Sequence, residues 1–150
     1  MAEIGRQYRN THENLLDLVE SLTDDQIAWT PNETTPSVGF HVWHLARWAD
    51  YLQEIINGRG SQIWEKEGLA ARWNLETKSL GYAQTGMEMD EKTVMLLRMP
   101  KKAVLLDYAC RAFAAALPPR ACHRATCGRA SCRTDCASMY WGLRESCSSR

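Results

Sequence analysis

The stretch from residue 38 to residue 57 constrains the fold of this chain more than any other segment. It lies between Ser37, a good helix N-cap, and Gly58, a typical C-terminal stop. Its apolar residues recur at helical spacing and form one tight stripe: Val38, Val42, Leu45, Ala49, Leu52 and Ile56. A second set widens the arc to about half of the circumference: His41, His44, Trp48, Tyr51 and Ile55. So wide an arc predicts a helix that contacts more than one neighbour, as in a bundle.

Two further helices are predicted on either side of this one. Apolar spacing favours a first helix over about residues 3–22, followed by a short turn in which Thr23 and Gln26 complete a capping box. A third helix is expected to have Pro100 in its first turn and to stop before Pro118. Its predicted buried face holds Val104, Leu105, Tyr108, Ala109, Ala112, Phe113, Ala116 and Leu117. The sequence shows no strand-like alternation, so the fold class is all-α.

A long connection separates the second and third predicted helices. Residues 60–95 contain helical pieces and then a stretch rich in Gly, Thr and Gln. A connection of this length in a compact domain is often functional. Trp64 and Trp73 either pin the connection to the bundle or line the mouth of a pocket beside His44, and we favour the first interpretation.

The last 33 residues differ in composition from the first 117, and we place a domain boundary between them. Residues 1–117 carry 12 Lys and Arg against 16 Asp and Glu, whereas residues 118–150 carry six Arg, no Lys and two acids. Residues 118–150 also lack Ile, Val and Phe, although a bundle helix needs an apolar residue every three or four positions. Either a frameshift in the coding sequence near Leu117 or a natural, poorly ordered tail would explain this composition.

The bulk properties exclude several classes of protein. A formal net charge of zero argues against a dedicated nucleic-acid binder. No apolar run approaches the roughly 20 residues of a membrane span, and the N-terminus lacks a signal-peptide core. We therefore expect a soluble, cytoplasmic protein with reduced thiols that binds neither membranes nor nucleic acid. Five of the six cysteines lie in the tail, and the first four of them have the spacing C-x4-C-x4-C-x3-C, which differs from the paired knuckles of zinc sites. The sixth, Cys110, is expected to be a small core residue.

Several segments of the chain resemble the DinB-like family. SVGFHVWHLARWADYL, residues 37–52, resembles the second helix of that family, in which a histidine followed by leucine is a metal ligand. QIWEKEGLAARWNL, GYAQTG and LLRMPKKAVLLDYACRAFAAAL follow in the order of the family's connection and third helix. The resemblance covers about residues 8–117. It implies an up-down-down-up four-helix bundle, a divalent metal such as zinc or nickel held by three histidines, and transfer of a low-molecular-weight thiol such as bacillithiol or mycothiol.

Only part of the implied metal site carries over to this chain. His44 matches the second-helix ligand, whereas the family's other two ligands form an H-x3-H pair on the fourth helix. The chain has no H-x3-H, and His123, its only histidine after residue 44, is a weaker candidate ligand than His44. His41 and His44 are three residues apart and could hold one ion together, although such a histidine is more often part of the core. His12 is expected to be a surface residue.

Two hypotheses for function follow from these observations. In the first, the protein is a metal-dependent thiol S-transferase acting on a small electrophile, impaired here by the missing H-x3-H pair. The metal would stabilise the thiolate of the cofactor at neutral pH. In the second, it is a non-catalytic bundle that binds a small molecule or a protein partner. A homodimer is expected in either case, because three helices with a wide apolar arc leave a seam where a fourth helix should lie.

Overall fold

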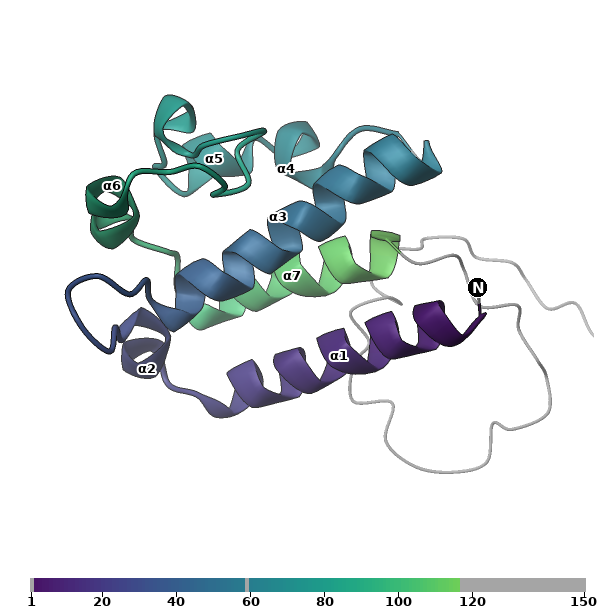
Figure 1. Cartoon of the computed structure of the whole chain (residues 1–150), viewed down its shortest axis with the longest axis horizontal. Helices are drawn as coiled ribbons and strands as arrows, with labels where there is room; N and C mark the ends of the chain where they lie inside the picture. Colours follow the sequence, from purple (N-terminus) through teal and green to yellow (C-terminus); the bar gives the residue numbers. More distant parts are fainter. Residues whose placement is uncertain (1, 59, 117–150) are drawn as a thin grey trace, which may run out of the picture. The chain divides into compact units, whose positions relative to one another are not determined.

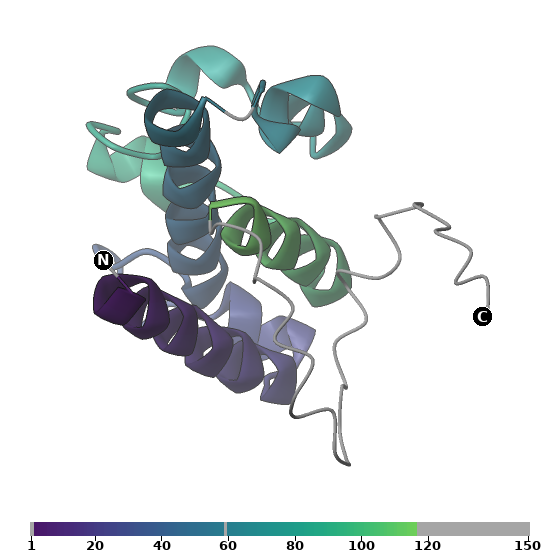
Figure 2. The same ribbon diagram turned by 90° about the vertical axis from the view of Figure 1, so that its right-hand side faces the viewer.

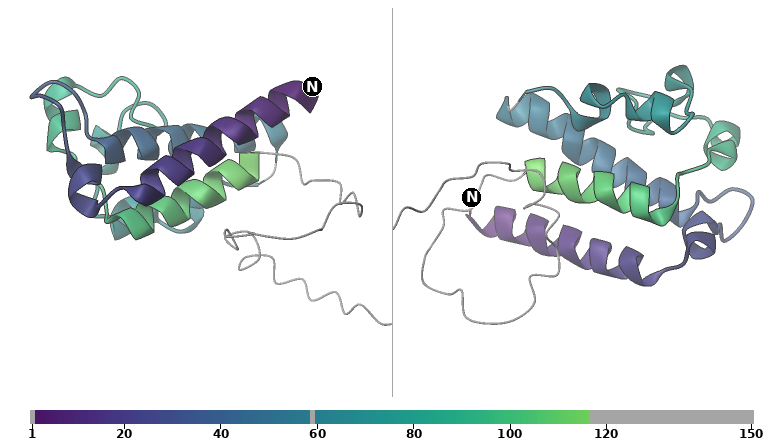
Figure 3. Two further views of the ribbon diagram at one scale, coloured as in Figure 1. Left: turned by 90° about the horizontal axis from the view of Figure 1, so that it is seen from below. Right: turned by 180° about the vertical axis from the view of Figure 1, so that it is seen from behind.

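The computed structural model describes residues 2–58 and 60–116 of the chain. Its three long helices are α1 (Ala2–Ser21), α3 (Val38–Asn57) and α7 (Lys102–Ala116). Helix α7 lies between α1 and α3 and packs against both (Figures 1 and 3). Helices α3 and α7 run in the same direction and α1 runs in the opposite one (Figure 1). This is the order of the first three helices of an up-down-down-up bundle, and the all-α prediction is confirmed for the described residues.

The parallel course of α3 and α7 explains the long connection between them. The chain has to travel back along α3 before α7 can begin, and residues 60–101 make this return beside α3, on the side away from α1 (Figure 2). The return contains α4 (Ile63–Lys66), α5 (Leu69–Arg72), the 3-10 helix η1 (Thr77–Ser79) and α6 (Glu91–Leu96). The described residues include one isolated antiparallel bridge, Tyr82 with Met87, and no strand.

The predicted helix ends are confirmed at three of the caps. Thr23 accepts a hydrogen bond from the Gln26 N–H and donates its own N–H to the Gln26 side chain, which completes the capping box of α2 (Asp24–Ala28). Ser37 accepts from the Phe40 N–H at the start of α3. Gly58 ends α3 in the left-handed conformation, with φ of 57°. These caps satisfy backbone groups that a helix end leaves without an intrahelical partner.

The start of α7 differs from the prediction. The helix begins at Lys102, two residues after Pro100, because Lys102 is held by the end of α1 and by α2. Its N–H donates to Asp24 Oδ1 at 2.7 Å, and its ammonium group donates to the carbonyls of Glu20 and Leu22 at 2.9 and 2.6 Å. A carboxylate thus caps the N-terminus of α7 while a cation caps the C-terminus of α1, which suits both helix dipoles.

The buried face of α3 is turned away from the predicted stripe. Within that stripe Val42 and Ala49 are buried, whereas Leu45, Leu52 and Ile56 are 43%, 39% and 71% exposed. The buried positions of α3 are Gly39, Phe40, Val42, Trp43, Ala46, Arg47, Ala49, Asp50 and Gln53. The large ring of Trp43 and an internally paired Arg47 and Asp50 orient the helix. Apolar spacing alone does not reveal this effect.

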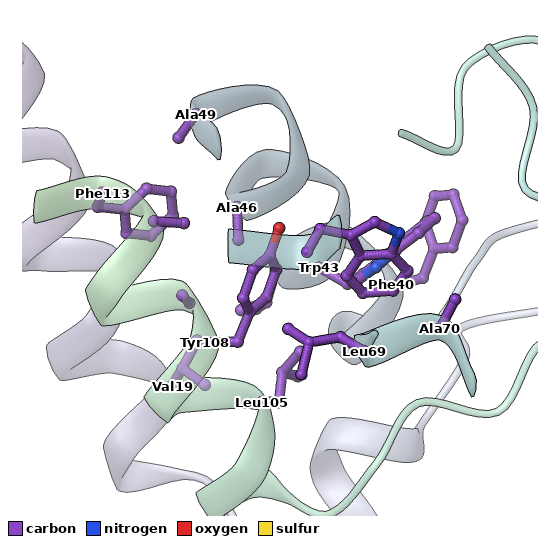
Figure 4. Packing of buried hydrophobic residues seen from close by; sticks show 14 of the residues in the cluster. Val19, Phe40, Trp43, Ala46, Ala49, Leu69, Ala70, Leu105, Tyr108 and Phe113 are labelled. Carbon is purple, nitrogen blue, oxygen red and sulfur yellow. The ribbon is translucent and has the colours of Figure 1, made fainter. Parts of the chain in front are cut away.

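The core joins the long helices to the connection. Trp43 and Ala46 of α3 face Tyr108 of α7 and Leu69 of α5 (Figure 4). Trp64 is buried against Trp43, Trp73 and Tyr108, which confirms that the tryptophans anchor the connection. The buried residues of α7 are Leu105, Tyr108, Ala109, Ala112 and Phe113. Val104 was predicted to be buried and is 47% exposed, and Leu117 lies outside the described residues.

His12 was expected to be a surface residue, and its position in the structure corrects this prediction. Its ring is half-buried, with its centroid 4.0 Å from that of Tyr8 and 4.0 Å from that of Phe113. His12 Nδ1 lies 2.7 Å from the Tyr8 carbonyl, one helical turn earlier. Burial lowers the pKa of His12 below its ordinary value, and the hydrogen bond to Tyr8 opposes this shift.

Residues 118–150, including the cysteine cluster and His123, lie outside the described residues, so the domain boundary near residue 117 stays a prediction. The helices within residues 2–58 and 60–116 are too short or too polar to cross a bilayer.

Candidate functional site

A tight turn at residues 82–85 is the part of the connection that lies against His44. The Thr85 N–H donates to the Tyr82 carbonyl at 2.9 Å, and the Tyr82 N–H donates to the Met87 carbonyl at 2.8 Å. Both central residues have positive φ, 47° at Ala83 and 54° at Gln84, as in the mirror-image turns that close short hairpins. Residues other than glycine adopt this conformation at a cost, so other contacts must hold the turn in place.

Arg47 supplies these contacts from α3. Its Nη2 donates to the Ala83 carbonyl at 3.0 Å, and its Nε donates to the Gln84 carbonyl at 3.0 Å. The planar guanidinium group presents its N–H donors in a fixed fork, which suits two successive carbonyls. The central residues of the turn are therefore bound directly to the buried face of α3.

The other donors of Arg47 point into the core. Nη1 donates to Asp50 Oδ2 at 3.2 Å and to the Tyr108 hydroxyl at 3.1 Å, and Nη2 also donates to Gln62 Oε1 at 2.6 Å. Together with the two turn carbonyls, these acceptors match all five N–H groups of the side chain. Arg47 is 1% exposed, and complete pairing is what makes its burial tolerable.

Asp50 connects the same network to the start of α4. Its Oδ1 accepts from the Ile63 N–H at 2.9 Å, and its Oδ2 accepts from the Trp64 N–H at 2.9 Å and from the Tyr108 hydroxyl at 3.1 Å. Burial between these groups raises the pKa of Tyr108 above its ordinary value, so the phenol stays protonated. Trp64 also donates its indole N–H to Gln84 Oε1 at 2.8 Å, which adds a side-chain bond to the turn.

His44 lies one helical turn before Arg47 and contacts the next carbonyl of the turn. Its Nδ1 is 2.5 Å from the Thr85 carbonyl oxygen. The ring stacks on Phe40, at 5.8 Å between centroids and 9° between planes, and Trp48 meets its edge at 6.4 Å. Because a carbonyl oxygen only accepts, Nδ1 must carry the proton, and the neutral ring keeps a lone pair on Nε2.

Gly86 permits this close approach of the turn to α3. A Cβ atom at this position would lie 2.8 Å from Trp43 Cζ3 and 3.0 Å from His44 Nδ1. The backbone there also has φ of 88°, which L side chains rarely adopt. Gly86, the second glycine of the GYAQTG segment, is thus required by the packing of the turn on His44.

An aromatic surface adjoins His44 on the outside of α3, and we define it by Trp48, Tyr51 and Tyr82. The rings of Trp48 and Tyr82 are nearly parallel at 6.5 Å, and the two tyrosine hydroxyls are 2.9 Å apart. The hydrogen bond to Tyr82 is the main cause that raises the pKa of Tyr51. Tyr82 is 51% exposed, so the surface is open to a ligand.

The described residues do not contain a complete metal site. His44 fits as one ligand, because a metal-binding histidine commonly donates its other ring N–H to a backbone carbonyl. His41 is exposed, with its ring edge-on to Phe40. Within residues 2–58 and 60–116, no three His, Cys, Asp or Glu side chains gather as metal ligands, and His123 lies outside this range. Zinc or nickel would therefore need donors from elsewhere.

Comparison with known proteins gives the family. A model of the DinB superfamily matches residues 7–125, which is most of the chain. The chain belongs to the DinB superfamily. The resemblance found in the sequence is thereby confirmed, and the parallel α3 and α7 are the second and third long helices of a DinB-type bundle. No curated protein matches the chain.

His44 stays a predicted ligand, and the network that orients it was not predicted from the sequence. Arg47, Asp50, Gln62 and Tyr108 were not singled out, although they connect α3, the connection and α7. One signal was present in the sequence: outside the predicted arc, Arg47 and Asp50 share a face of the helix with Trp43. A charged pair beside so large an apolar side chain requires partners.

Proposed function

We propose that this chain is a DinB-type bundle that binds a small molecule, in the first place a low-molecular-weight thiol, beside His44, and that metal-dependent thiol transfer is impaired in it. The fixed orientation of one imidazole carries the proposal. The Thr85 carbonyl and two neighbouring rings hold His44, and no hydrogen bond joins its Nε2 to another described residue. A half-buried acceptor beside the aromatic surface suits a small ligand with one polar group.

The histidine content of the sequence supports the impairment. A site of three histidines needs two partners for His44, and the family takes them from an H-x3-H pair. The four histidines of this chain are at positions 12, 41, 44 and 123, and no two of them have that spacing. One imidazole, or His41 and His44 together, binds a divalent ion more weakly than three ligands do.

Metal titration tests the impairment. We expect zinc and nickel to bind the full chain weakly and to be lost on desalting, with His44→Ala weakening the residual binding and His12→Ala leaving it unchanged. Stoichiometric metal that survives desalting, disappears in His44→Ala and supports transfer of bacillithiol or mycothiol to an electrophile would contradict the proposal. That result would establish the intact enzyme instead.

Ligand titration tests the binding site separately. Bacillithiol and mycothiol, added without metal, should shift the NMR signals of His44 and of the Trp48 indole. Trp48→Ala should weaken this binding, whereas Trp29→Ala is a matched control because Trp29 is an exposed tryptophan outside the site. If neither thiol shifts these signals, the proposed ligand class is wrong.

A further inference from the structure

We propose that Arg47 is a positioning residue for His44. By holding the turn at residues 82–85, it determines which ring nitrogen of His44 carries the proton and where Nε2 points. The inference deepens the proposed function and rests on it for the role of His44 as the ligand-binding group. The orientation of the ring is a separate property, and it can be measured in the protein without any ligand.

Three successive carbonyls of the turn connect Arg47 to His44. Ala83 and Gln84 present theirs to Arg47, and Thr85 presents the next one to His44. Neighbouring peptide planes in a tight turn are linked through few free dihedral angles. A guanidinium group that fixes the first two carbonyls therefore also fixes the direction of the third.

The turn needs an external support, because its own conformation is costly. Ala83 and Gln84 both have positive φ, and such residues persist only where the surroundings hold them. Arg47 can provide that support because Asp50, Gln62 and Tyr108 hold its guanidinium group from the inner side. The side chain is thus a rigid link between the core and the turn.

The third carbonyl then selects the tautomer of His44. A carbonyl oxygen has no proton to donate, so Nδ1 must donate, and in the neutral ring Nε2 is then the acceptor. If the turn moved away, Nδ1 would lose this partner and neither tautomer would be selected. Arg47 therefore acts on His44 through the backbone, without touching the ring.

The charge of Arg47 alone does not account for this role. A lysine would keep a positive charge facing Asp50, but its ammonium group is a compact point charge and lacks the planar fork. It could not reach both turn carbonyls and the three inner acceptors at once. Arg47→Lys is therefore the substitution that separates support of the turn from pairing with Asp50.

Nitrogen NMR of the His44 side chain in the full, ligand-free chain tests the inference. We expect a wild-type pattern with the proton on Nδ1, and a loss of that pattern in Arg47→Lys, with both tautomers visible. Gly86→Ala should cause the same loss while Arg47 is kept, because the added Cβ would push the turn away from Trp43 and His44. If Arg47→Lys fails to fold, Gly86→Ala still tests whether the turn selects the tautomer. A folded Arg47→Lys that keeps the wild-type pattern would overturn the role of Arg47.

Tyr108→Phe is the matched control. It removes a hydroxyl that contacts Arg47 and Asp50, but it leaves both turn carbonyls bound to Arg47. This variant should lower the free energy of unfolding while the His44 pattern stays that of the wild type. The inference is overturned if wild-type His44 carries its proton on Nε2, if Gly86→Ala keeps the wild-type pattern, or if Tyr108→Phe changes it as much as Arg47→Lys does.

Discussion

Arg47 and Asp50 form an ion pair that is almost completely shielded from water. Their side chains are 1% and 0% exposed, and each has several further hydrogen-bond partners. Removing two charges from water costs several kcal/mol per ion, so the pair is stable only because its remaining donors and acceptors are satisfied. The stability of the site therefore depends on every partner being present.

Removal of Asp50 tests this dependence. Asp50→Ala leaves the Arg47 charge buried without its carboxylate, and we expect a loss of about 3–5 kcal/mol in the free energy of unfolding. Denaturant unfolding followed by circular dichroism measures it. Glu3→Ala is a matched control, because Glu3 and Arg6 form a pair with the same spacing at the surface, with side chains 57% and 67% exposed. A similar loss in both variants would show that burial is not the cause.

His12 gives a prediction with a defined pH dependence. Burial holds the pKa of His12 below its ordinary value, so the folded chain takes up its proton at lower pH than the unfolded chain does. Between the lowered pKa and about 6.5, the unfolded state binds more protons, and stability therefore rises with pH. This contribution is lost as the pH falls through that window.

The His12 contribution can be isolated with two variants. In His12→Gln, the free energy of unfolding should change less between about pH 7 and 5 than it does in the wild type. Asn10→Ala should keep the wild-type slope, because Asn10 is an exposed residue of α1 without a titratable group. Urea unfolding at several pH values gives both slopes. Equal slopes in the wild type and His12→Gln would exclude His12 as the cause.

At the scale of elements, the sequence located the helices better than it oriented them. Local signals fix the ends of α3, since Ser37 and Gly58 act through their own backbone and side chains. The rotation of α3 depends on Trp43 and on the buried pair of Arg47 and Asp50, whose partners are distant in sequence. A count of apolar residues cannot find such partners.

The same distinction applies to the site. His44 could be singled out as a candidate because it occurs in a recognisable segment, whereas its orientation depends on the Thr85 carbonyl, 41 residues later. Ala83 and Gln84 adopt positive φ in the turn, although neither residue type favours this conformation. The turn therefore had to be seen in the structure.

Glycine substitutions just before the turn and in α1 should have opposite effects. A Cβ at Gly81 would lie 2.0 Å from the Met87 carbonyl oxygen, and φ there is 70°, so Gly81→Ala should lower the free energy of unfolding by about 1–3 kcal/mol. Gly5→Ala lies in α1 with no atom within 4 Å of its Cβ, and it should raise the free energy by about 0.5–1 kcal/mol. Thermal unfolding of both variants measures the signs, and a stabilised Gly81→Ala would refute the geometry of the turn.

For the molecule as a whole, the exposed stripe of α3 (Leu45, Leu52 and Ile56) supports the expected homodimer. These three side chains repeat along one face of the helix and remain exposed. Burial of apolar surface contributes about 25 cal/mol per Å², so a second copy packed on the stripe gains several kcal/mol before the costs of association. We propose a dimer at micromolar concentration.

Light scattering tests the dimer. The wild type should have twice the mass of one chain, and Leu52→Glu combined with Ile56→Glu should return it to the mass of one chain with unchanged helicity. Leu96→Glu is the matched control, because Leu96 is a 73% exposed leucine on α6, away from the stripe. A wild-type protein of single-chain mass over the whole concentration range would disprove the proposal.

The Asp50 carboxylate also has a consequence for the order in which the protein folds. Its bonds to the Ile63 and Trp64 N–H groups close loops of 13 and 14 residues, whereas its bond to the Tyr108 hydroxyl closes one of 58. Loop-closure entropy grows with the logarithm of loop length, and this difference amounts to about 1 kcal/mol. Apart from the Arg47–Asp50 pair within α3, the corner between α3 and α4 is therefore the part of the network that forms at the smallest entropic cost. When α7 packs against α3, its Tyr108 hydroxyl adds a third hydrogen bond to an Asp50 carboxylate that the start of α4 can reach at lower entropic cost.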